Sequence, residues 1–194
     1  MNLLKQVYPA VAFTIVLTVL VGIIYPFAMT GLSELIFKEK ARGSLIERKG
    51  KIIGSRLIGQ PFNGPGYFHP RPSAAGSGYD ATASGGTNLG PTSKKLFEEQ
   101  VKARRKQLRD EGRNLEIPID LITSSASGLD PHISPAAAEF QIPRVARERQ
   151  MSDDGVRTFV RRHTEERQFG VLGEPRINVL ELNIALDEGA KTGK

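Results

Sequence analysis

The chain has 194 residues, of which 39% are hydrophobic and 25% are charged, and its formal net charge is +6. This composition excludes an intrinsically disordered protein, and the length is sufficient for one domain with its own core. The sequence contains no cysteine, which excludes disulfides, thiolate zinc sites and thiol catalysis. The positive charge suits a nucleic acid, an anionic membrane surface or an acidic partner, and does not choose among them.

Residues 1–30 predict a membrane-spanning helix. No charged residue lies between Val7 and Met29, and a helix of this length extends about 34 Å, enough to cross a hydrocarbon core of about 30 Å. Pro26 lies near the end of the stretch and should kink or end the helix. A cleaved signal peptide is the alternative, but the apolar stretch is long for one and lacks a clean cleavage site.

The rest of the chain predicts a juxtamembrane helix or connector over 31–50, ending at Gly50, and a globular domain over 51–194. More Lys and Arg residues follow the span than precede it, which favours a cytoplasmic domain. Domains longer than about 60 residues nevertheless translocate largely regardless of such charges. Charge alone therefore leaves the orientation of the domain open.

The globular domain should begin with a short strand and a long ordered loop. The segment 51–59 is rich in Ile and bounded by glycine, which is typical of a strand. Gly, Pro, Ser, Asn and Thr dominate residues 60–92, which indicates a loop, and loops of this length are usually functional or disordered. Aromatic side chains favour an ordered surface here, namely Phe62, Tyr67, Phe68 and Tyr79.

A helix is expected from about 93 to 111, with Thr92 or Ser93 as its N-cap and Gly112 after its end. One face would be apolar, through Phe97, Val101 and Leu108. The basic run over 102–109 suits a phosphate or an anionic lipid, and is otherwise a solvated helix face. Because no aromatic residues are interleaved with it, it does not mark a nucleic-acid surface.

The second half of the domain predicts a strand over 117–123, a second polar turn over 124–134 and two further helical regions. Ser134 followed by Pro135 is a strong helix start, and Pro143 should break or kink that helix into two short ones. Another helix should begin at Ser152 and turn Val156, Phe159 and Val160 inward. The chain should end with a strand from 176 and a helix from Asn183 onward. The predicted fold class is α+β: one transmembrane helix followed by one mixed globular domain.

Candidate reaction chemistry is sparse. The three histidines lie far apart, and none has a partner at the spacing of a metal-binding helix. The segment 125–128 resembles a nucleophile elbow, but Ser125 stands where that motif requires glycine. A membrane-anchored hydrolase using Ser127, His132 and Asp130 is therefore the alternative function, and no catalytic or metal-ligating residue is assigned otherwise.

Residues 85–90 match the first half of a phosphate-binding loop, G-x-x-x-x-G. Pro91 and Thr92 follow, where the motif requires a lysine and a Ser or Thr, so the loop cannot neutralise phosphates as a complete motif does. A tight glycine-shaped turn is the simpler interpretation. The N–H groups of Ser84, Gly85 and Gly86 still offer a low-specificity contact to an anion.

Six segments resemble, in order along the chain, the C subunit of the bacterial Kdp potassium-transporting P-type ATPase. They are GSRLIGQPF (54–62), YFHPRPSA (67–74), SGGTNLGPT (84–92), SASGLDPHIS (125–134), AEFQIPRVA (138–146) and PRINVLELNIALD (175–187). The departures are minor, with Thr87 where serine is expected and Ile177 where valine is expected. Together with the N-terminal span, the segments cover most of the chain.

The resemblance implies a non-catalytic subunit in the bacterial cytoplasmic (inner) membrane. Its partners would be a channel-like potassium-selective subunit, a P-type ATPase subunit that carries the phosphorylated aspartate, a small membrane peptide and membrane lipid, but no nucleic acid. Its role would be that of a catalytic chaperone, which stabilises the complex and raises the affinity of the ATPase subunit for ATP. Relatives place the globular domain outside the membrane, where direct contact with cytoplasmic ATP is impossible, and we favour that placement.

On this interpretation, the long polar loop and the second polar turn form the subunit interface. The interface candidates combine aromatic anchors with polar groups, namely Tyr67, Phe68, Arg71, Asn88, Asp130 and His132. The alternative is that Arg71, Asn88 and Asp130 hold turns together through hydrogen bonds to the backbone. For ATP contact, Gln141 joins Ser84, Gly85 and Gly86 as a candidate, because it interrupts an apolar helix face. A satisfied buried amide is the alternative for Gln141.

Overall fold

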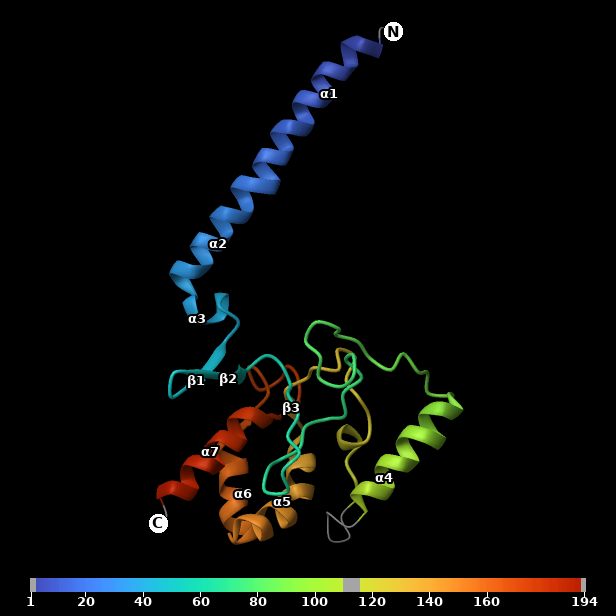
Figure 1. Cartoon of the computed structure of the whole chain (residues 1–194), viewed down its shortest axis with the longest axis vertical. Coiled ribbons are helices and arrows are strands. Elements are labelled where there is room, and N and C mark those ends of the chain that lie inside the picture. Colours follow the sequence, from blue (N-terminus) through green and yellow to red (C-terminus); the bar gives the residue numbers. More distant parts are fainter. Residues whose placement is uncertain (1–2, 110–115, 193–194) are drawn as a thin grey trace. The chain divides into compact units, whose positions relative to one another are not determined.

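The computed structural model describes residues 3–109 and 116–192, and the chain divides into two compact units, Met1–Leu45 and Ile46–Lys194. The first unit is a long helix of three consecutive segments, α1 (Leu3–Leu17), η1 (Thr18–Ile24) and α2 (Tyr25–Ile36), followed by the short α3 (Lys38–Ala41) (Figure 1). Within the described chain, the stretch Lys5–Ile36 is the one helix long and apolar enough to cross a membrane. Its side chains are exposed in the isolated chain, as a lipid-facing surface requires.

Of the two outcomes predicted at Pro26, an end of the helix is wrong, because the helix continues to Ile36. The turn before this proline is a π-helix, in which the Tyr25 N–H donates to the carbonyl of Leu20, five residues earlier. A proline ring within a regular α-helix clashes with the carbonyl four residues before it. A wider turn at this point relieves that crowding, so the helix continues to Ile36.

The predicted connector over 31–50 is helical only in its first part. Residues after α3 form a two-stranded hairpin, β1 (Leu45–Arg48) and β2 (Lys51–Ser55). Its turn residues Lys49 and Gly50 have φ values of 51° and 73°, the left-handed conformation that two-residue hairpin turns favour. The strand predicted over 51–59 is confirmed as far as Ser55.

No helix or strand lies between β2 and η2 (Lys95–Val101), which confirms the long loop over 60–92. The following helix, η2 with α4 (Lys102–Leu108), begins where expected, and the Ser93 hydroxyl accepts the Leu96 N–H at 3.4 Å. Leu108 is buried, whereas Phe97 is half exposed, so the predicted apolar face is only partly covered. Residues 110–112, with the predicted helix end at Gly112, lie outside the described residues.

The two serine caps are confirmed. The Ser134 hydroxyl accepts the Ala137 N–H at 3.0 Å and begins α5 (Pro135–Arg149), and Ser152 caps α6 (Asp153–Arg162) in the same way. The predicted break at Pro143 is wrong, because α5 is one continuous helix. Buried residues on both sides of Pro143 hold the helix against the core, and this packing outweighs the missing backbone donor.

The C-terminal half holds a small antiparallel sheet in the order β3 (His132–Ile133), β5 (Arg176–Asn178) and β4 (Thr164–Glu165). In its register, His132 faces Asn178, and Ile177 faces both Ile133 and Thr164. The strand predicted over 117–123 is wrong, since this segment forms the single 3-10 turn η3 (Ile119–Leu121) after Pro118. Together these elements confirm the α+β class.

The last helix, α7 (Val179–Thr192), begins four residues earlier than predicted. The Asn178 side chain explains this start, because its Oδ1 atom accepts the Glu181 N–H at 3.2 Å, as a helix N-cap does. Val179 and Leu182 lie in the segment predicted to be a strand, and both are buried as residues of a helix.

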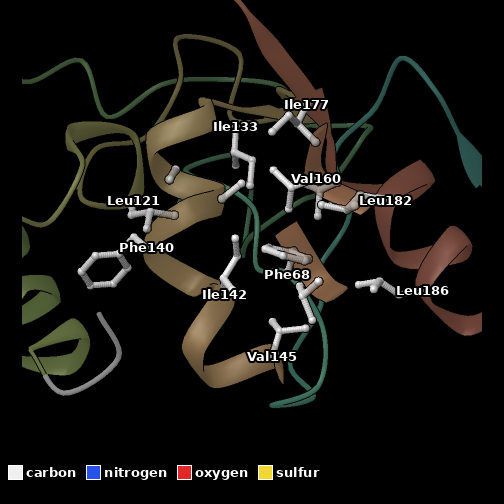
Figure 2. Packing of buried hydrophobic residues seen from close by; sticks show 14 of the residues in the cluster. Phe68, Leu121, Ile133, Phe140, Ile142, Val145, Val160, Ile177, Leu182 and Leu186 are labelled. Atoms are coloured by element: carbon white, nitrogen blue, oxygen red, sulfur yellow. The ribbon is translucent and has the colours of Figure 1, made fainter. Parts of the chain in front are cut away.

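The core lies between α5, α6, α7 and the small sheet, and Leu108 of α4, Leu121 of η3 and Phe68 of the long loop are also buried in it. Helices α5, α6 and α7 pack against one another in sequence (Figure 1). Figure 2 shows the loop residue Phe68 within the hydrophobic cluster, among side chains that α5 and α7 contribute. The labelled members are Phe68, Leu121, Ile133, Phe140, Ile142, Val145, Val160, Ile177, Leu182 and Leu186. A loop without regular structure is thus anchored at the centre of the domain.

Candidate functional site

The centre of the long loop is paired with two buried side-chain amides as if with a β-strand. The Phe68 N–H donates to Asn183 Oδ1 at 2.8 Å, and Asn183 Nδ2 donates to the Phe68 carbonyl at 2.9 Å. The next loop residue repeats the pattern, since the His69 N–H donates to Gln141 Oε1 at 2.7 Å and Gln141 Nε2 donates to the His69 carbonyl at 3.1 Å. Both amides are about 1% exposed. They satisfy backbone groups that burial would otherwise leave unpaired.

Two arginines and an aspartate complete this arrangement. Arg144 Nη1 donates to the Tyr67 carbonyl at 2.9 Å, and its Nη2 donates to Gln141 Oε1 at 2.7 Å. Arg149 pairs with Asp187 at 2.9 Å, and its guanidinium lies 4.8 Å from the centre of the Tyr67 ring. We call this set the loop brace: Gln141, Arg144 and Arg149 from α5, with Asn183 and Asp187 from α7.

The loop brace decides the placement of three predicted site residues. Phe68 is fully buried, so its ring is a core group rather than a surface anchor. The Tyr67 ring stacks on Arg149, and its hydroxyl donates to Asp187 Oδ2 at 3.3 Å. Gln141 is the satisfied buried amide of the sequence alternative, with both its oxygen and its nitrogen already hydrogen-bonded.

The glycine-rich segment is packed against the second polar turn. The Gly85 N–H donates to the Ser127 carbonyl at 2.9 Å, and the Ser84 hydroxyl donates to the same carbonyl at 3.0 Å. A Cβ atom at Gly86 would lie 2.9 Å from the Ala126 carbonyl oxygen, so glycine is required for this close approach. The Gly85 N–H, the Ser84 hydroxyl and the close approach at Gly86 therefore pack the glycine-rich segment against the second polar turn.

Three of the predicted interface residues do meet. Arg71, Asp130 and His132 line one cleft of about 610 Å³, together with Asp120, Glu174 and Arg176 among others. Arg71 Nη1 donates to Asp130 Oδ2 at 3.2 Å, and His132 Nδ1 lies 3.3 Å from Asp130 Oδ1. The buried Nε atom of Arg71 has no hydrogen-bond partner within the described residues. We call this group the Arg71 cleft.

Asp130 is the electrostatic centre of the Arg71 cleft. Partial burial acts to raise its pKa, but hydrogen bonds from the His132 side chain and backbone, with the charges of His132 and Arg71, hold the pKa below its usual value. The same carboxylate accepts the His132 N–H at 3.0 Å and so fixes the turn before β3. Asp130 is therefore ionised at neutral pH and joins the long loop to the second polar turn.

The remaining candidates are separate from this cleft. Asn88 is exposed and has a φ of 54°, a conformation that asparagine tolerates in tight turns. The basic run on α4 borders a different hollow of about 480 Å³, through Lys102, Arg105, Lys106 and Arg109. Of that run, Lys102 is paired with Glu98, and the neighbouring Arg104 donates to the Leu121 carbonyl at 3.1 Å.

The hydrolase alternative finds no assembled relay in the described chain. The Ser127 hydroxyl accepts the Leu129 N–H at 3.1 Å and lies 3.4 Å from the Ser125 hydroxyl, and no hydrogen bond joins it to His132. A nucleophile and its base must lie within hydrogen-bond reach, so only the Asp130–His132 half of a triad is present. Among the described residues, no group of three His, Asp or Glu side chains could hold a metal ion.

Sequence reasoning missed most of the loop brace. Arg144, Arg149, Asn183 and Asp187 were not candidates, although Asn183 interrupts an apolar run in the same way as Gln141. A polar residue within the buried face of a helix was the available signal, because such a group requires a partner. Its partner could not be predicted, since it is the backbone of a loop more than 70 residues distant in sequence.

Comparisons with known proteins indicate the same family over most of the chain. A family model described as "KdpC: K+-transporting ATPase, c chain" matches residues 7–188. A curated protein of Koribacter versatilis named "Potassium-transporting ATPase KdpC subunit" is 59% identical over 183 residues, covering 94% of each chain. Proteins of the same name from Geobacter sulfurreducens and Bradyrhizobium diazoefficiens are 53% and 48% identical, covering 95% and 97% of this chain and 98% and 99% of their own.

The loop brace predicts a large cost for replacing Gln141 with leucine. Gln141→Leu removes both hydrogen bonds that this side chain makes to the partly buried N–H and C=O groups of His69, at about 1–3 kcal/mol each. We expect the free energy of unfolding of the full chain in detergent to fall by about 3 kcal/mol. Gln107→Leu is the control, because Gln107 is exposed, and its effect should be below about 0.5 kcal/mol. Equal effects would contradict the bracing role.

The lowered pKa of Asp130 predicts an acid-sensitive contribution to stability. A carboxyl with a lower pKa in the folded state stabilises that state above its unfolded pKa of about 3.9, and the contribution is lost as the pH falls through the folded pKa. Asp130→Asn should therefore destabilise the chain at pH 7, and the difference from wild type should shrink below about pH 4. Denaturant unfolding at several pH values measures it, and a pH-independent difference would contradict the assignment.

Proposed function

Because the chain belongs to the KdpC family of potassium-transporting ATPase subunits, we propose that it is a non-catalytic accessory subunit that stabilises the pump complex. Its partners are a channel-like potassium-selective subunit, the P-type ATPase subunit and a small membrane peptide. Its contribution is to hold these subunits together and to support ATP binding by the ATPase subunit. Potassium transport and ATP hydrolysis belong to the partners.

The observation that supports this proposal most directly is that side chains of the domain hold the polar loop in one conformation. Its centre is fixed by the loop brace, and its flank is fixed by the Arg71–Asp130 pair. These contacts produce a surface of defined shape without bringing a nucleophile and a base together. A pre-ordered polar surface loses little conformational entropy on docking, which suits a subunit interface.

We propose that ATP binds to the ATPase subunit and not to this chain. The Gly85 N–H and the Gln141 amide are already engaged within the domain, so direct contact would require breaking these bonds. The increase in ATP affinity is therefore exerted through the assembled complex rather than through Ser84, Gly85, Gly86 or Gln141. An indirect effect of this kind is a coupling free energy between two sites.

The proposed location is the cytoplasmic membrane of a bacterium, with the N-terminal helix as a single span. Lys5–Ile36 has the length and composition for this role. We place the globular domain on the outer face, against the channel-like subunit, where its Arg71 cleft would form part of the interface. Long domains translocate largely regardless of flanking charge, so the basic residues after the span do not oppose this placement.

Assembly tests the proposed function. The tagged full chain, purified in mild detergent from its own potassium-starved membranes, should carry two larger membrane subunits and potassium-stimulated ATPase activity. Removal of the subunit should raise the ATP concentration needed for half-maximal activity. Purification of the chain alone, without ATPase activity, would overturn the proposal.

A matched pair of arginine variants locates the interface. Arg71 and Arg157 have similar side-chain exposure, 25% and 28%, and each is paired with a carboxylate, Asp130 and Glu139 respectively. Arg71→Ala should lower the retained partners at least about tenfold, as loss of an interface anchor does, while Arg157→Ala should leave them unchanged. Equal retention with both variants would exclude the Arg71 cleft from the interface.

A further inference from the structure

The hairpin that joins β4 to β5 ends in an exposed apolar turn. We call residues 168–172 the hairpin tip. Phe169, Val171 and Leu172 are 84%, 73% and 57% exposed, and Phe169 is the most exposed large hydrophobic residue of the described chain. Single exposed hydrophobic residues are common on protein surfaces, but three within four consecutive positions form a patch.

The hairpin tip is closed by its own backbone. The Gln168 N–H donates to the Leu172 carbonyl and the Leu172 N–H donates to the Gln168 carbonyl, both at 2.9 Å. The Gly170 N–H adds a bond to the Arg167 carbonyl at 3.0 Å. These bonds present the three apolar side chains in a fixed arrangement, so docking would cost little ordering entropy.

Phe169 occupies an unfavourable backbone conformation as well as an exposed position. Its φ is 55°, in the left-handed region that bulky residues rarely adopt. Glycine or asparagine would satisfy the same turn at lower cost. The domain gains no core packing from the ring, because the ring is exposed. Strained residues that the fold itself does not explain are characteristic of binding sites.

Two ion pairs join the two sides of the hairpin at its base and so hold the tip in place. Arg167 pairs with Glu174 at 2.6 Å, and Arg176 pairs with Glu165 at 3.0 Å. Ile177 of β5 is fully buried in the core and so anchors this strand. Because both arginines of the base are ion-paired, this part of the hairpin lacks the free cations that favour anionic lipid headgroups.

The hairpin tip continues directly into the Arg71 cleft. Glu174, Pro175 and Arg176, which follow the tip along the chain, line that cleft together with Arg71 and Asp130. An apolar turn beside a cleft that carries the charged pair Arg71 and Asp130 has the composition of an interface centre with polar groups near it. Three side chains are too small a patch to support a stable homodimer, which buries about 800 Å² on each partner.

We propose that the hairpin tip is the apolar anchor of the subunit interface, with Phe169, Val171 and Leu172 inserted into an apolar hollow on another protein subunit of the same complex. The inference rests on the proposed function and adds the anchoring residues and the chemistry of the partner surface. The partner hollow is lined by hydrophobic side chains and bordered by polar groups that face the Arg71 cleft.

Site-specific photocrosslinking identifies the occupant. A benzophenone amino acid at position 169 of the full chain, illuminated in native membranes, should give an adduct with a larger membrane subunit. The same group at Thr158, an exposed position on α6, should give little. An adduct with lipid only, an adduct with a second copy of the chain, or no adduct at position 169 would overturn the inference.

Phe169→Asn tests the energetic role without disturbing the fold, since asparagine accepts the left-handed conformation. The thermal midpoint should be equal to or higher than that of wild type, while partner retention during purification should fall at least about tenfold, as for an interface anchor. Ile52→Asn is the matched control, because Ile52 is 64% exposed in β2, and it should retain the partners.

The outcomes separate the two proposals. Wild-type chain that carries no partners contradicts the proposed function itself. Wild-type chain that carries partners, with Phe169→Asn retaining them equally well, contradicts only the anchor assigned to the hairpin tip.

Discussion

Two buried amides hold the domain together at its most irregular point. Asn183 and Gln141 each bind both the N–H and the C=O of one loop residue, Phe68 and His69 respectively. A side-chain amide has the donor and acceptor of a peptide group, so the pair replaces the neighbouring strand that this segment lacks. With its backbone satisfied, the loop can place Phe68 in the core between helices that also supply the amides. An unpaired backbone at this depth would be too costly to bury.

Because of this arrangement, polar groups that could bind a ligand instead hold segments of the domain together. The amide of Gln141, the N–H of Gly85 and the hydroxyl of Ser84 are engaged in contacts between segments of the domain. The features that remain available to a partner are the Arg71 cleft and the apolar hairpin tip beside it. The proposed role of this KdpC-family chain is therefore docking, and in that proposal its influence on nucleotide binding is transmitted by the complex. The exposed Phe169, in its unfavourable backbone conformation, is the clearest cost in stability that contacts within the isolated domain do not offset.

Local signals in the sequence predicted local structure well. The caps at Ser134 and Ser152, the long apolar helix and the absence of regular structure over 60–92 all follow from residue chemistry within a few positions. One error has a tertiary cause, because α5 passes through Pro143 with buried residues on both sides of the proline. The early start of α7 was a missed local signal, because Asn178 caps the helix three residues before Glu181. For the site, the sequence identified Arg71, Asp130 and His132, which do meet, but it assigned Phe68 to a surface. The partners of Gln141 and Asn183 could not be predicted, because contacts over more than 70 residues leave no local pattern.

Hydrogen–deuterium exchange of the full chain tests the amide bracing most directly. The backbone N–H groups of Phe68 and His69 lie in no helix or strand, so a loop held only by its own turns would exchange them rapidly. Bracing by Asn183 and Gln141 predicts protection of these two amides comparable to that of buried α5 amides, with rapid exchange at the exposed loop residues Ser77 and Asn88. Exchange of Phe68 and His69 as fast as that of Ser77 and Asn88 would contradict the account.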